Sequence, residues 1–549
     1  MLDESQVQSF ELFSDDGSVR VRDATDNDVD QIRQIFKACY GEDYAYPAYY
    51  DSHLLKKMVY ADDTVMLVAE DVANGRVVGT GSVLLDVGAF ADLTGEFGRL
   101  AVHPDARRRG IGRLLMQARI DRVQDRLHLG LVDNRAAHSF SQRISLSHQF
   151  VPVGYLPNKL RIAKRESIVV FARHFGDALA LRKNNPRIIP EAYPLAEWAL
   201  PGCGLDCDAI VDEQAATYPQ QDDFQLDHLT TQGYTTLMRF ERGRVQNREI
   251  FGPVQLHYGL FQLRATHTNY LIARKHNEIV GAVGFTLDSV ERAIRIIELV
   301  ALDDLPIHFL LDRLVQTYGS KSGVEFMEVD VSAYSPRMQR TLLTLGFLPA
   351  AYVPAQVFQL VERLDAIKMV RLFSSLDSIR PEVVDSARSI ADSVIGSFTA
   401  KVVEPRVAAA ADRIGLFHGL STEQAQKVAA ICTVQRFEPG ARILVENQRD
   451  DVTYLVLEGT ARVAAGEPPQ EVGTIGRGEC LGEMALLRDV PHGATVYAET
   501  DVEVAELRQE QLNALIRQRP DIGLILYRNL ATGIGEKLSR ADRTALARS

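Results

Sequence analysis

Arginine and glycine residues between positions 99 and 115 form the part of the sequence best suited to bind an anion. The stretch begins at Arg99, continues through a short apolar run and His103-Pro104, and reaches three arginines followed by Gly-Ile-Gly. Helical apolar spacing comes next, so the backbone N–H groups at the helix start are unpaired and carry the positive end of the helix dipole. Gly110 and Gly112 let the backbone approach a bound group closely.

We therefore expect this loop to bind a pyrophosphate, with the arginines supplying charge and hydrogen-bond donors. The alternative is a solvated, arginine-rich helix start whose glycines serve only the turn. The order of strand, His-Pro, Arg-x-x-Gly-x-Gly and helix favours binding. The residues expected at the ligand are Leu100, Ala101, Val102, Arg107, Arg108, Arg109, Gly110, Ile111, Gly112 and Arg113.

The segments around the loop alternate strand and helix patterns, which predicts an α/β fold with helices crossing between strands. Thr25 and Asp26 can cap a helix after the first strand. Asn74-Gly75 is a strong hairpin signal between two apolar runs. The expected strands are 19–23, 65–70, 76–85, 96–102 and 127–132, and a helix is expected at 111–126.

Arg107, Gly110 and Gly112 occupy the positions of motif A in the GNAT family of N-acyltransferases, and the resemblance extends over about residues 19–175. The resemblance implies that the loop holds the pyrophosphate of acetyl-CoA or another acyl-CoA. It also implies that strand 99–102 places backbone groups beside the thioester carbonyl, where donors would stabilise the oxyanion of a tetrahedral intermediate.

Direct acyl transfer to an amine needs a base for the ammonium and an acid for the leaving thiolate. Glu96 is the expected base, because strand alternation puts it on one face with Gly98, Leu100 and Val102. In many family members a tyrosine is the acid, but Phe140 stands at that place here and cannot donate a proton. His138 and Ser141 are the expected substitutes, solvent is an alternative, and Tyr155 is a further candidate.

A second series of elements downstream repeats the order of the first. Its expected strands are 270–274, 279–287, 293–301 and 325–331, with helices at 306–319 and 335–345. At the place of the anion loop it carries Asp303 and Asp304 and no Gly-x-Gly, and like charges would repel a pyrophosphate. Ser335-Pro336 and the later Leu345-Gly346-Phe347 also resemble the end of a GNAT unit. We expect a degenerate, non-catalytic copy that completes the substrate cleft or holds the architecture.

The C-terminal part changes to short β-runs separated by glycine turns, which predicts a β-roll or barrel. Phe437-Glu438-Pro439-Gly440 and the cassette at 478–487 resemble the cyclic-nucleotide-binding family. The resemblance implies that cAMP or cGMP binds at Gly482, Glu483, Met484, Ala485, His492, Gly493 and Ala494.

His492 stands where that family places an arginine that pairs with the phosphate. A mostly neutral imidazole offers no bidentate fork. Losing the charge-assisted pair between this arginine and the phosphate costs about 1.5–3 kcal/mol of binding free energy, or about one to two decades in affinity, unless Arg488 compensates. An altered ligand and a purely structural roll are therefore alternatives to cyclic nucleotide binding.

The composition and charge of the chain argue against DNA binding, membrane insertion, secretion and metal binding. The chain has 549 residues and a net charge of -12, which argues against DNA binding, as does the short segment after the final helix. No apolar run long enough to span a membrane and no signal-like N-terminus is found. The five scattered cysteines suit a reducing cytoplasm, and Cys203 and Cys207 lack the partners of a metal site, so none is expected.

The predicted fold class is a multi-domain α/β protein with tandem GNAT folds, a helical connector and an all-β, jelly-roll-like C-terminal domain with flanking helices. The connector carries an apolar helical stripe (Val384 to Phe398) that packs on a neighbouring domain or pairs with itself. The final helix either pairs two subunits as a homodimer or folds back on the roll. The expected boundaries are a tail at 1–17, domains at 18–200, 201–365 and 414–549, and the connector at 366–413.

The predicted function is acyl-CoA-dependent N-acyl transfer to an amine, either a small molecule, an amino-acid-like acceptor or a protein lysine. Allosteric control by the C-terminal domain is expected by analogy with known fusions of the two modules. The alternative is a sensor or scaffold that binds acyl-CoA and a nucleotide without turnover.

Overall fold

The computed structural model describes residues 10–549 except 43, 45, 88–91, 163, 232–236, 240–247, 253, 258–259, 264–267, 277, 320–322, 375, 377–380, 411–413, 430, 450, 487–490 and 549. The chain divides into two compact units, Met1–Ile395 and Gly396–Ser549. Most of the tail expected at 1–17 lies outside the described residues, but Glu11–Phe13 form strand β1, which pairs with β2. No described helix has the length and apolar character needed to cross a membrane.

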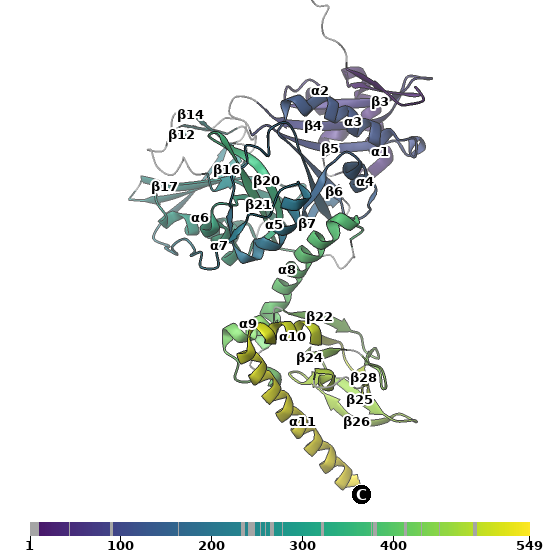
Figure 1. Ribbon diagram of the computed structural model, residues 1–549, viewed down its shortest axis with the longest axis vertical. Coiled ribbons are helices and arrows are strands. Elements are labelled where there is room, and N and C mark those ends of the chain that lie inside the picture. Colours follow the sequence, from purple (N-terminus) through teal and green to yellow (C-terminus); the bar gives the residue numbers. More distant parts are fainter. Residues whose placement is uncertain are drawn as a thin grey trace, which may run out of the picture. The chain divides into compact units, whose positions relative to one another are not determined.

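The first half of the larger unit contains the strands and helices that the sequence predicts around the anion loop (Figure 1). The hairpin at Asn74-Gly75 is confirmed by the antiparallel pairing of β3 and β4. Strands β7 and β8 were not predicted. The elements are β2 (Val19–Asp23), α1 (Val29–Tyr40), α2 (Ser52–Val59), β3 (Thr64–Asp71), β4 (Arg76–Asp86), β5 (Thr94–Val102), α3 (Ile111–Val123), β6 (Leu129–Arg135), α4 (Phe140–Ser147), β7 (Val151–Ile162) and β8 (Lys164–His174).

The second half follows the same plan with its own set of elements. These are β11 (Gln225–Thr231), β16 (Thr268–Lys275), β17 (Glu278–Asp288), β18 (Ala293–Ala301), α6 (Leu305–Gly319), β19 (Phe326–Ser332), α7 (Pro336–Thr344), β20 (Leu348–Gln359) and β21 (Glu362–Leu372). Residues 366–372 were expected in the helical connector, but they complete β21, which pairs with β19 and β20.

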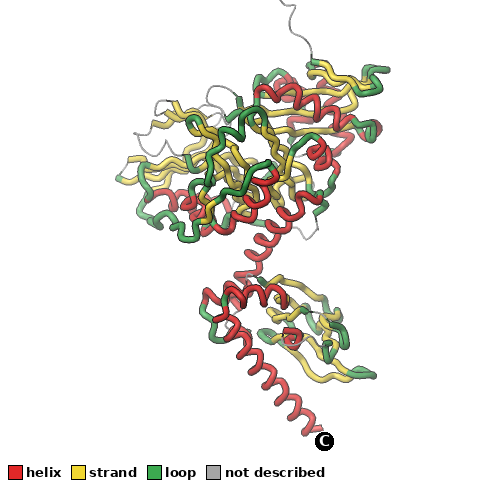
Figure 2. The backbone as a smooth tube through the Cα atoms, in the orientation of Figure 1, coloured by secondary structure: helices red, strands yellow, loops and turns green. Residues whose placement is uncertain are grey.

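One sheet runs through both halves, and its strand order is repeated. The first half reads β2-β3-β4-β5-β6-β8-β7, and the second reads β11-β16-β17-β18-β19-β21-β20. Figure 2 shows these strands as a continuous inner layer with helices on the outside. The halves join where Gly154 of β7 faces Ala351 of β20. A side chain at Gly154 would lie 2.0 Å from the Ala351 Cβ, so this joint requires glycine.

A helix follows each series of strands. Helix α5 (Tyr193–Gly202) follows the first series and packs on β7 and β20. Helix α8 (Asp385–Ala410) follows the second series, and the boundary between the units falls within it. The apolar stripe predicted for this segment is buried at Ala387, Ile390, Ala391, Val394 and Phe398, so it is not free to pair with another copy.

The C-terminal unit is a roll of two four-stranded antiparallel sheets. One has the order β22 (Cys432–Phe437), β29 (Val502–Arg508), β24 (Val452–Glu458), β27 (Cys480–Leu481). The other has the order β23 (Arg442–Leu444), β28 (Thr495–Ala498), β25 (Ala461–Ala465), β26 (Gln470–Ile475). Helix α11 (Pro520–Arg548) buries Ile522, Leu526 and Leu530 in the same core as Leu416 and Phe417, so its first half folds back on the roll.

Candidate active site

Strands β5 and β6 separate at the centre of the first half and leave space between them. Their parallel pairing covers only Thr94–Glu96 and Leu129–Leu131, although β5 continues to Val102 and β6 to Arg135. Beyond these pairs the backbone N–H and C=O groups of the two strands do not form hydrogen bonds with each other. Such an opening in the middle of a sheet can accept an extended ligand that adds its own polar groups.

A β-bulge in β5 changes which side chains face this opening. The register with β4 shifts between Thr80 and Ser82, and Arg99 has a positive φ of 53°. Arg119 is fully buried and stabilises the bulge by donating to the carbonyls of Ser82 at 3.2 Å and Gly98 at 3.1 Å. The single face expected for Glu96, Gly98, Leu100 and Val102 is therefore wrong, because an extra residue interrupts strand alternation.

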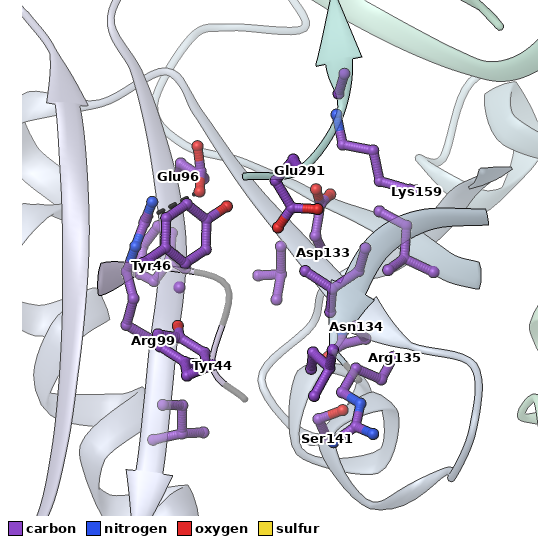
Figure 3. A pocket seen from close by; sticks show the side chains of 18 of the residues that line it. Tyr44, Tyr46, Glu96, Arg99, Asp133, Asn134, Arg135, Ser141, Lys159 and Glu291 are labelled. Atoms are coloured by element: carbon purple, nitrogen blue, oxygen red, sulfur yellow. Dashed lines mark hydrogen bonds and ion pairs between the residues drawn. The ribbon is translucent and has the colours of Figure 1, made fainter. Parts of the chain in front are cut away.

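As a result of the bulge, Glu96 and Arg99 both face the same cavity, where they form an ion pair of 2.9 Å (Figure 3). The cavity has a volume of about 360 Å³. Arg99 also lies over the ring of Tyr46, with 5.3 Å between the guanidinium carbon and the ring centroid. Three tyrosines form the aromatic side of the cavity: Tyr40 at the end of α1, and Tyr44 and Tyr46 in the segment that follows it.

The structure places all three residues expected to handle protons in this one cavity. Glu96 comes from β5, and His138 and Ser141 come from the turn and helix after β6. The Nδ1 of His138 and the Oγ of Ser141 are buried and have no hydrogen-bond partner among the described residues. Burial, followed by the charge of Arg135, lowers the pKa of His138, so the ring is neutral near pH 7. Phe140 is 71% exposed and Tyr155 is buried, and neither is among the residues that line the cavity.

Asp133 on β6 is a cavity residue that the sequence analysis missed. Its carboxylate is accessible from the cavity (Figure 3), but protein surrounds the cavity and removes much of the bulk water. This burial raises the pKa of Asp133 to about 6, Lys159 opposes the rise, and Glu96 adds to it. No ion pair or hydrogen bond of its side chain is found within the described residues. A carboxylate with this pKa is suited to take up a proton near neutral pH.

The anion loop lies at the other end of β5, between Val102 and the start of α3. Gly110 caps α3 with a positive φ of 76°, and a side chain there would meet no atom within 4 Å. The carbonyl of Gly110 accepts the amides of Arg113 and Leu114. The amides of residues 108–112 find no acceptor in the described part of the chain. They form the open, positively polarised helix start that the sequence predicted.

The arginines of the loop differ in how free they are to meet an anion. Arg109 is held by Asp71 of β3 at 2.9 Å. Arg107 makes only long contacts, to the Val102 carbonyl at 3.5 Å and the Cys39 sulfur at 3.8 Å. Arg108 and Arg113 are exposed. An anion would therefore meet Arg107, Arg108 and Arg113 first, while Arg109 chiefly joins the loop to the sheet.

The matching place in the second half is closed to anions. Helix α6 begins at Leu305, whose amide is already bound by the Asp303 carboxylate at 2.9 Å. Asp304 pairs with Arg337 of α7. An anion there would have to displace a bound carboxylate, as the two aspartates in the sequence predicted.

The second half instead contributes one side of the cavity. Its lining residues are Thr286, Asp288, Glu291, Ala293, Ile294, Arg295 and Glu328. The sequence analysis expected the second half to complete the cleft but named none of these residues. Lys159 of β7 pairs with Glu328 across the two halves. Among the described residues no group of three or more His, Cys, Asp or Glu could hold a metal ion.

In the C-terminal roll, the predicted nucleotide residues surround the start of a short 3-10 helix, Glu483–Leu486. Gly482 has a positive φ of 70°, and a side chain there would lie 2.9 Å from the Val452 carbonyl and 3.4 Å from the His492 ring. His492 is buried and Met484 is 43% exposed. Gly493 and Ala494 follow before β28. Arg488, proposed to compensate for His492, lies outside the described residues.

The region around the anion loop and the C-terminal roll each match the model of a known protein family. Residues 29–145 match the model of the Acetyltransferase (GNAT) family. Residues 434–519 match the model of the cyclic nucleotide-binding domain. The chain therefore contains a GNAT acetyltransferase domain and a C-terminal cyclic nucleotide-binding domain.

Similar proteins share only part of their length with this chain. A cAMP-dependent protein kinase regulatory subunit of Yarrowia lipolytica is 34% identical over 103 residues, 19% of this chain and 28% of that protein. The cyclic AMP receptor protein of Thermus thermophilus is 30% identical over 130 residues, 23% of this chain and 58% of that protein. A solved cyclic nucleotide-binding domain from Methylobacillus flagellatus has 20% identity and a TM-score of 0.26, covering 28% of this chain and 86% of its own.

Proposed function

We propose that this protein is an acyl-CoA-dependent N-acyltransferase whose first GNAT domain, within residues 18–200, transfers an acyl group to an amine. The observation that carries the proposal is the separation of β5 and β6 beside a bulge, with unpaired amides at the start of α3 at one end and a carboxylate-lined cavity at the other. Acetyl-CoA or another acyl-CoA would lie along this opening as the first substrate.

In this proposal the loop from Arg107 to Arg113 binds the pyrophosphate, and backbone groups of Leu100, Ala101 and Val102 contact the acyl-bearing arm. Donors aimed at the thioester oxygen would stabilise the tetrahedral intermediate. Asp133, or Glu96 as the sequence predicted, takes the proton from the acceptor ammonium. Solvent, or water relayed through the Ser141 hydroxyl, protonates the leaving thiolate, and the neutral His138 ring can donate a hydrogen bond to it.

We propose residues 201–365 as a second, degenerate GNAT-like domain. The repeated strand order supports it, and so does the register of the parallel pair, because Thr94–Leu129 in the first half corresponds to Ala293–Phe326 in the second. In this alignment Arg295 and Asp330 take the places of Glu96 and Asp133, and they pair at 3.2 Å. Lys368 also binds Asp330 at 2.7 Å, so the counterpart of Asp133 in the second half is held by two cations.

The direct test is acyl transfer by the purified chain. With acetyl-CoA and a panel of amines, we expect thiol release that depends on both substrates. Calorimetry with acetyl-CoA, combined with this turnover assay, separates the proposal from the alternative of a sensor. The phenylalanine at the acid position, Phe140, favours that alternative. Binding of acetyl-CoA without turnover of any amine would support the sensor.

We further propose that the C-terminal domain, within residues 414–549, regulates the transferase. Support comes from the segment that leads into α8. The Gln142 side chain accepts the Val384 amide at 3.0 Å and donates to the Glu382 carbonyl at 3.0 Å, and the Glu382 amide donates to the Ala136 carbonyl at 2.8 Å. Gln142 also donates to the carbonyls of Arg135 and His138. One buried amide thus joins the connector to the turn that carries the candidate thiolate acids.

Replacing Gln142 with alanine should weaken regulation more than it weakens the enzyme. Losing these hydrogen bonds leaves several buried backbone groups unpaired, and we expect the response of kcat to a bound cyclic nucleotide to fall at least about fivefold. Activity measured with and without cAMP or cGMP checks this.

The second half offers a matched control. Gln339 of α7 similarly accepts the Ile189 amide at 3.0 Å and donates to the Ser332 carbonyl at 2.9 Å. Gln339→Ala should lower the melting temperature comparably but preserve the nucleotide response. Equal responses in both variants would refute the coupling through Gln142.

A single substitution tests the nucleotide site of the roll. His492→Arg would restore a charge-assisted donor next to Gly482. We expect it to tighten cAMP or cGMP binding about 10- to 100-fold, as measured by calorimetry. No change, with the fold intact, would indicate a different ligand or a structural role for the roll.

A further inference from the structure

Glu291 is a buried carboxylate of the cavity with one oxygen that lacks a hydrogen-bond donor among the described residues. It lies in the turn between β17 and β18, it is 8% exposed, and it lines the cavity. Its Oε2 accepts the Arg161 amide at 2.9 Å, whereas its Oε1 is buried without a hydrogen-bond partner. Figure 3 shows this carboxylate directed into the cavity, across from Glu96 and Tyr46. A buried carboxylate oxygen without a donor is costly unless a ligand supplies one.

The position of Glu291 is fixed by contacts within its turn and across the two halves. Asp288 accepts the amides of Val290 at 2.9 Å and Glu291 at 2.8 Å. The Arg165 guanidinium, from β8 of the first half, donates to the Glu291 carbonyl and pairs with Glu325 at 2.7 Å. The carboxylate is thus held in place before any ligand binds, as a recognition group should be.

The residues around the cavity include more carboxylates than cations that are free to pair with them. Three cations are each paired with a carboxylate: Arg99 with Glu96, Lys159 with Glu328, and Arg295 with Asp330. Arg135 pairs with Glu166, and the buried Arg119 is bound to backbone carbonyls. Within the described residues, three carboxylates line the cavity without a cation at ion-pair distance: Asp133, Asp288 and Glu291. Asp288 already accepts two backbone amides of its own turn, whereas Asp133 and Glu291 each have an oxygen left for a ligand.

Asp133 and Glu291 come from different halves of the unit and face a shared aromatic group, Tyr46. Burial is the largest cause of the raised pKa of the Tyr46 hydroxyl. The negative charges of Glu96, Glu291 and Asp133 raise this pKa further. A ligand beside Tyr46 therefore enters the field of three carboxylates, only one of which has a cation of its own.

We infer that the acceptor is a small amine with two positive charges, one held by Glu291 while the other reacts near Asp133. This inference rests on the proposed transferase function. The reacting ammonium gives one proton to Asp133, and its nitrogen then attacks the thioester carbonyl carbon. A C–N bond forms, the C–S bond breaks, and the nitrogen loses a second proton, which balances the proton that the departing thiolate takes up; Asp133 then returns its proton to solvent. The products are the monoacylated diamine, free coenzyme A and one proton released to solvent.

The size and shape of the cavity agree with such an acceptor. About 360 Å³ accommodates a short diamine together with the end of an acyl thioester, and the second half covers the side on which Glu291 lies. An amino acid would place its own carboxylate among the unpaired carboxylates, which repel it. A monoamine would leave the Glu291 oxygen unpaired.

The test uses the full-length chain with acetyl-CoA and three acceptors: 1,4-diaminobutane, n-butylamine of equal length, and a lysine-containing peptide. We expect a KM for the diamine at least about tenfold below that of the monoamine. Glu291→Gln keeps the acceptor for the Arg161 amide but removes the charge, so it should raise the KM for the diamine about 10- to 100-fold. The KM for n-butylamine should rise much less, so the preference for the diamine should shrink. The Kd for acetyl-CoA shows whether the coenzyme site is intact. Glu278→Gln, at an exposed position in the same half, is the matched control.

The outcomes separate this inference from the proposal on which it rests. Equal or better use of the monoamine or the peptide overturns the diamine, as does an unchanged diamine KM in Glu291→Gln. Acetyl-CoA binding without acetylation of the diamine also overturns it but leaves the coenzyme site standing. If the wild-type chain does not bind acetyl-CoA, the transferase proposal itself fails.

Discussion

Arg107→Glu is expected to weaken acetyl-CoA binding at least about 100-fold. The substitution removes a charge-assisted donor, worth about 1.5–3 kcal/mol, and adds a carboxylate that repels the pyrophosphate. In the structure Arg107 has only long contacts, so it can turn toward an anion at little cost. Calorimetric titration with acetyl-CoA measures the change.

Arg126→Glu makes the same charge change at an exposed position beyond the other end of α3 and serves as the control. It should bind acetyl-CoA with nearly wild-type affinity at physiological salt, because screening weakens interactions beyond about 10 Å. Unchanged affinity in the Arg107 variant would mean that the glycine turn does not hold the coenzyme. Equal losses in both variants would indicate a general effect of net charge.

The anion loop was predictable because its function depends on local sequence. Strand, turn, glycines and helix follow one another within residues 99–115, and hydrogen bonding at a helix start is the same in every fold. The second half was predictable for the same reason, since its hydrophobic periods and the two aspartates are local features. Helix α6 begins at Leu305, with its first amide bound by Asp303.

The cavity residues could not be predicted in the same way. Glu291 meets the first half only because β7 and β20 join at Gly154 and Ala351, a contact between strands almost 200 residues apart. The bulge at Arg99 also escaped the sequence, and it broke the alternation used to assign Glu96 a face. Asp133 has no motif around it, and its raised pKa arises from the walls that enclose it. A strand at 366–372 was read as helix because apolar residues in a fully buried strand do not alternate.

Asp133→Asn is expected to lower kcat about 100- to 1,000-fold and to remove an acidic limb from its pH profile. A base must be ionised to accept a proton, and the pKa of Asp133 is raised to about 6. In the wild type, kcat should therefore level off above pH 6 and fall about tenfold per unit below it. Asparagine cannot accept the proton, so the residual rate should lack this dependence.

Glu96→Gln distinguishes the two carboxylates. Glu96 forms an ion pair of 2.9 Å with Arg99 and would have to leave this partner to take a proton, whereas Asp133 has no cation at ion-pair distance among the described residues. We expect Glu96→Gln to cost less than about tenfold in kcat and to keep the limb near pH 6. If Glu96→Gln abolishes that limb and Asp133→Asn preserves it, the proton goes to Glu96. The ion pair would then have to open when the acceptor binds, and Arg99 would become the group that controls the base.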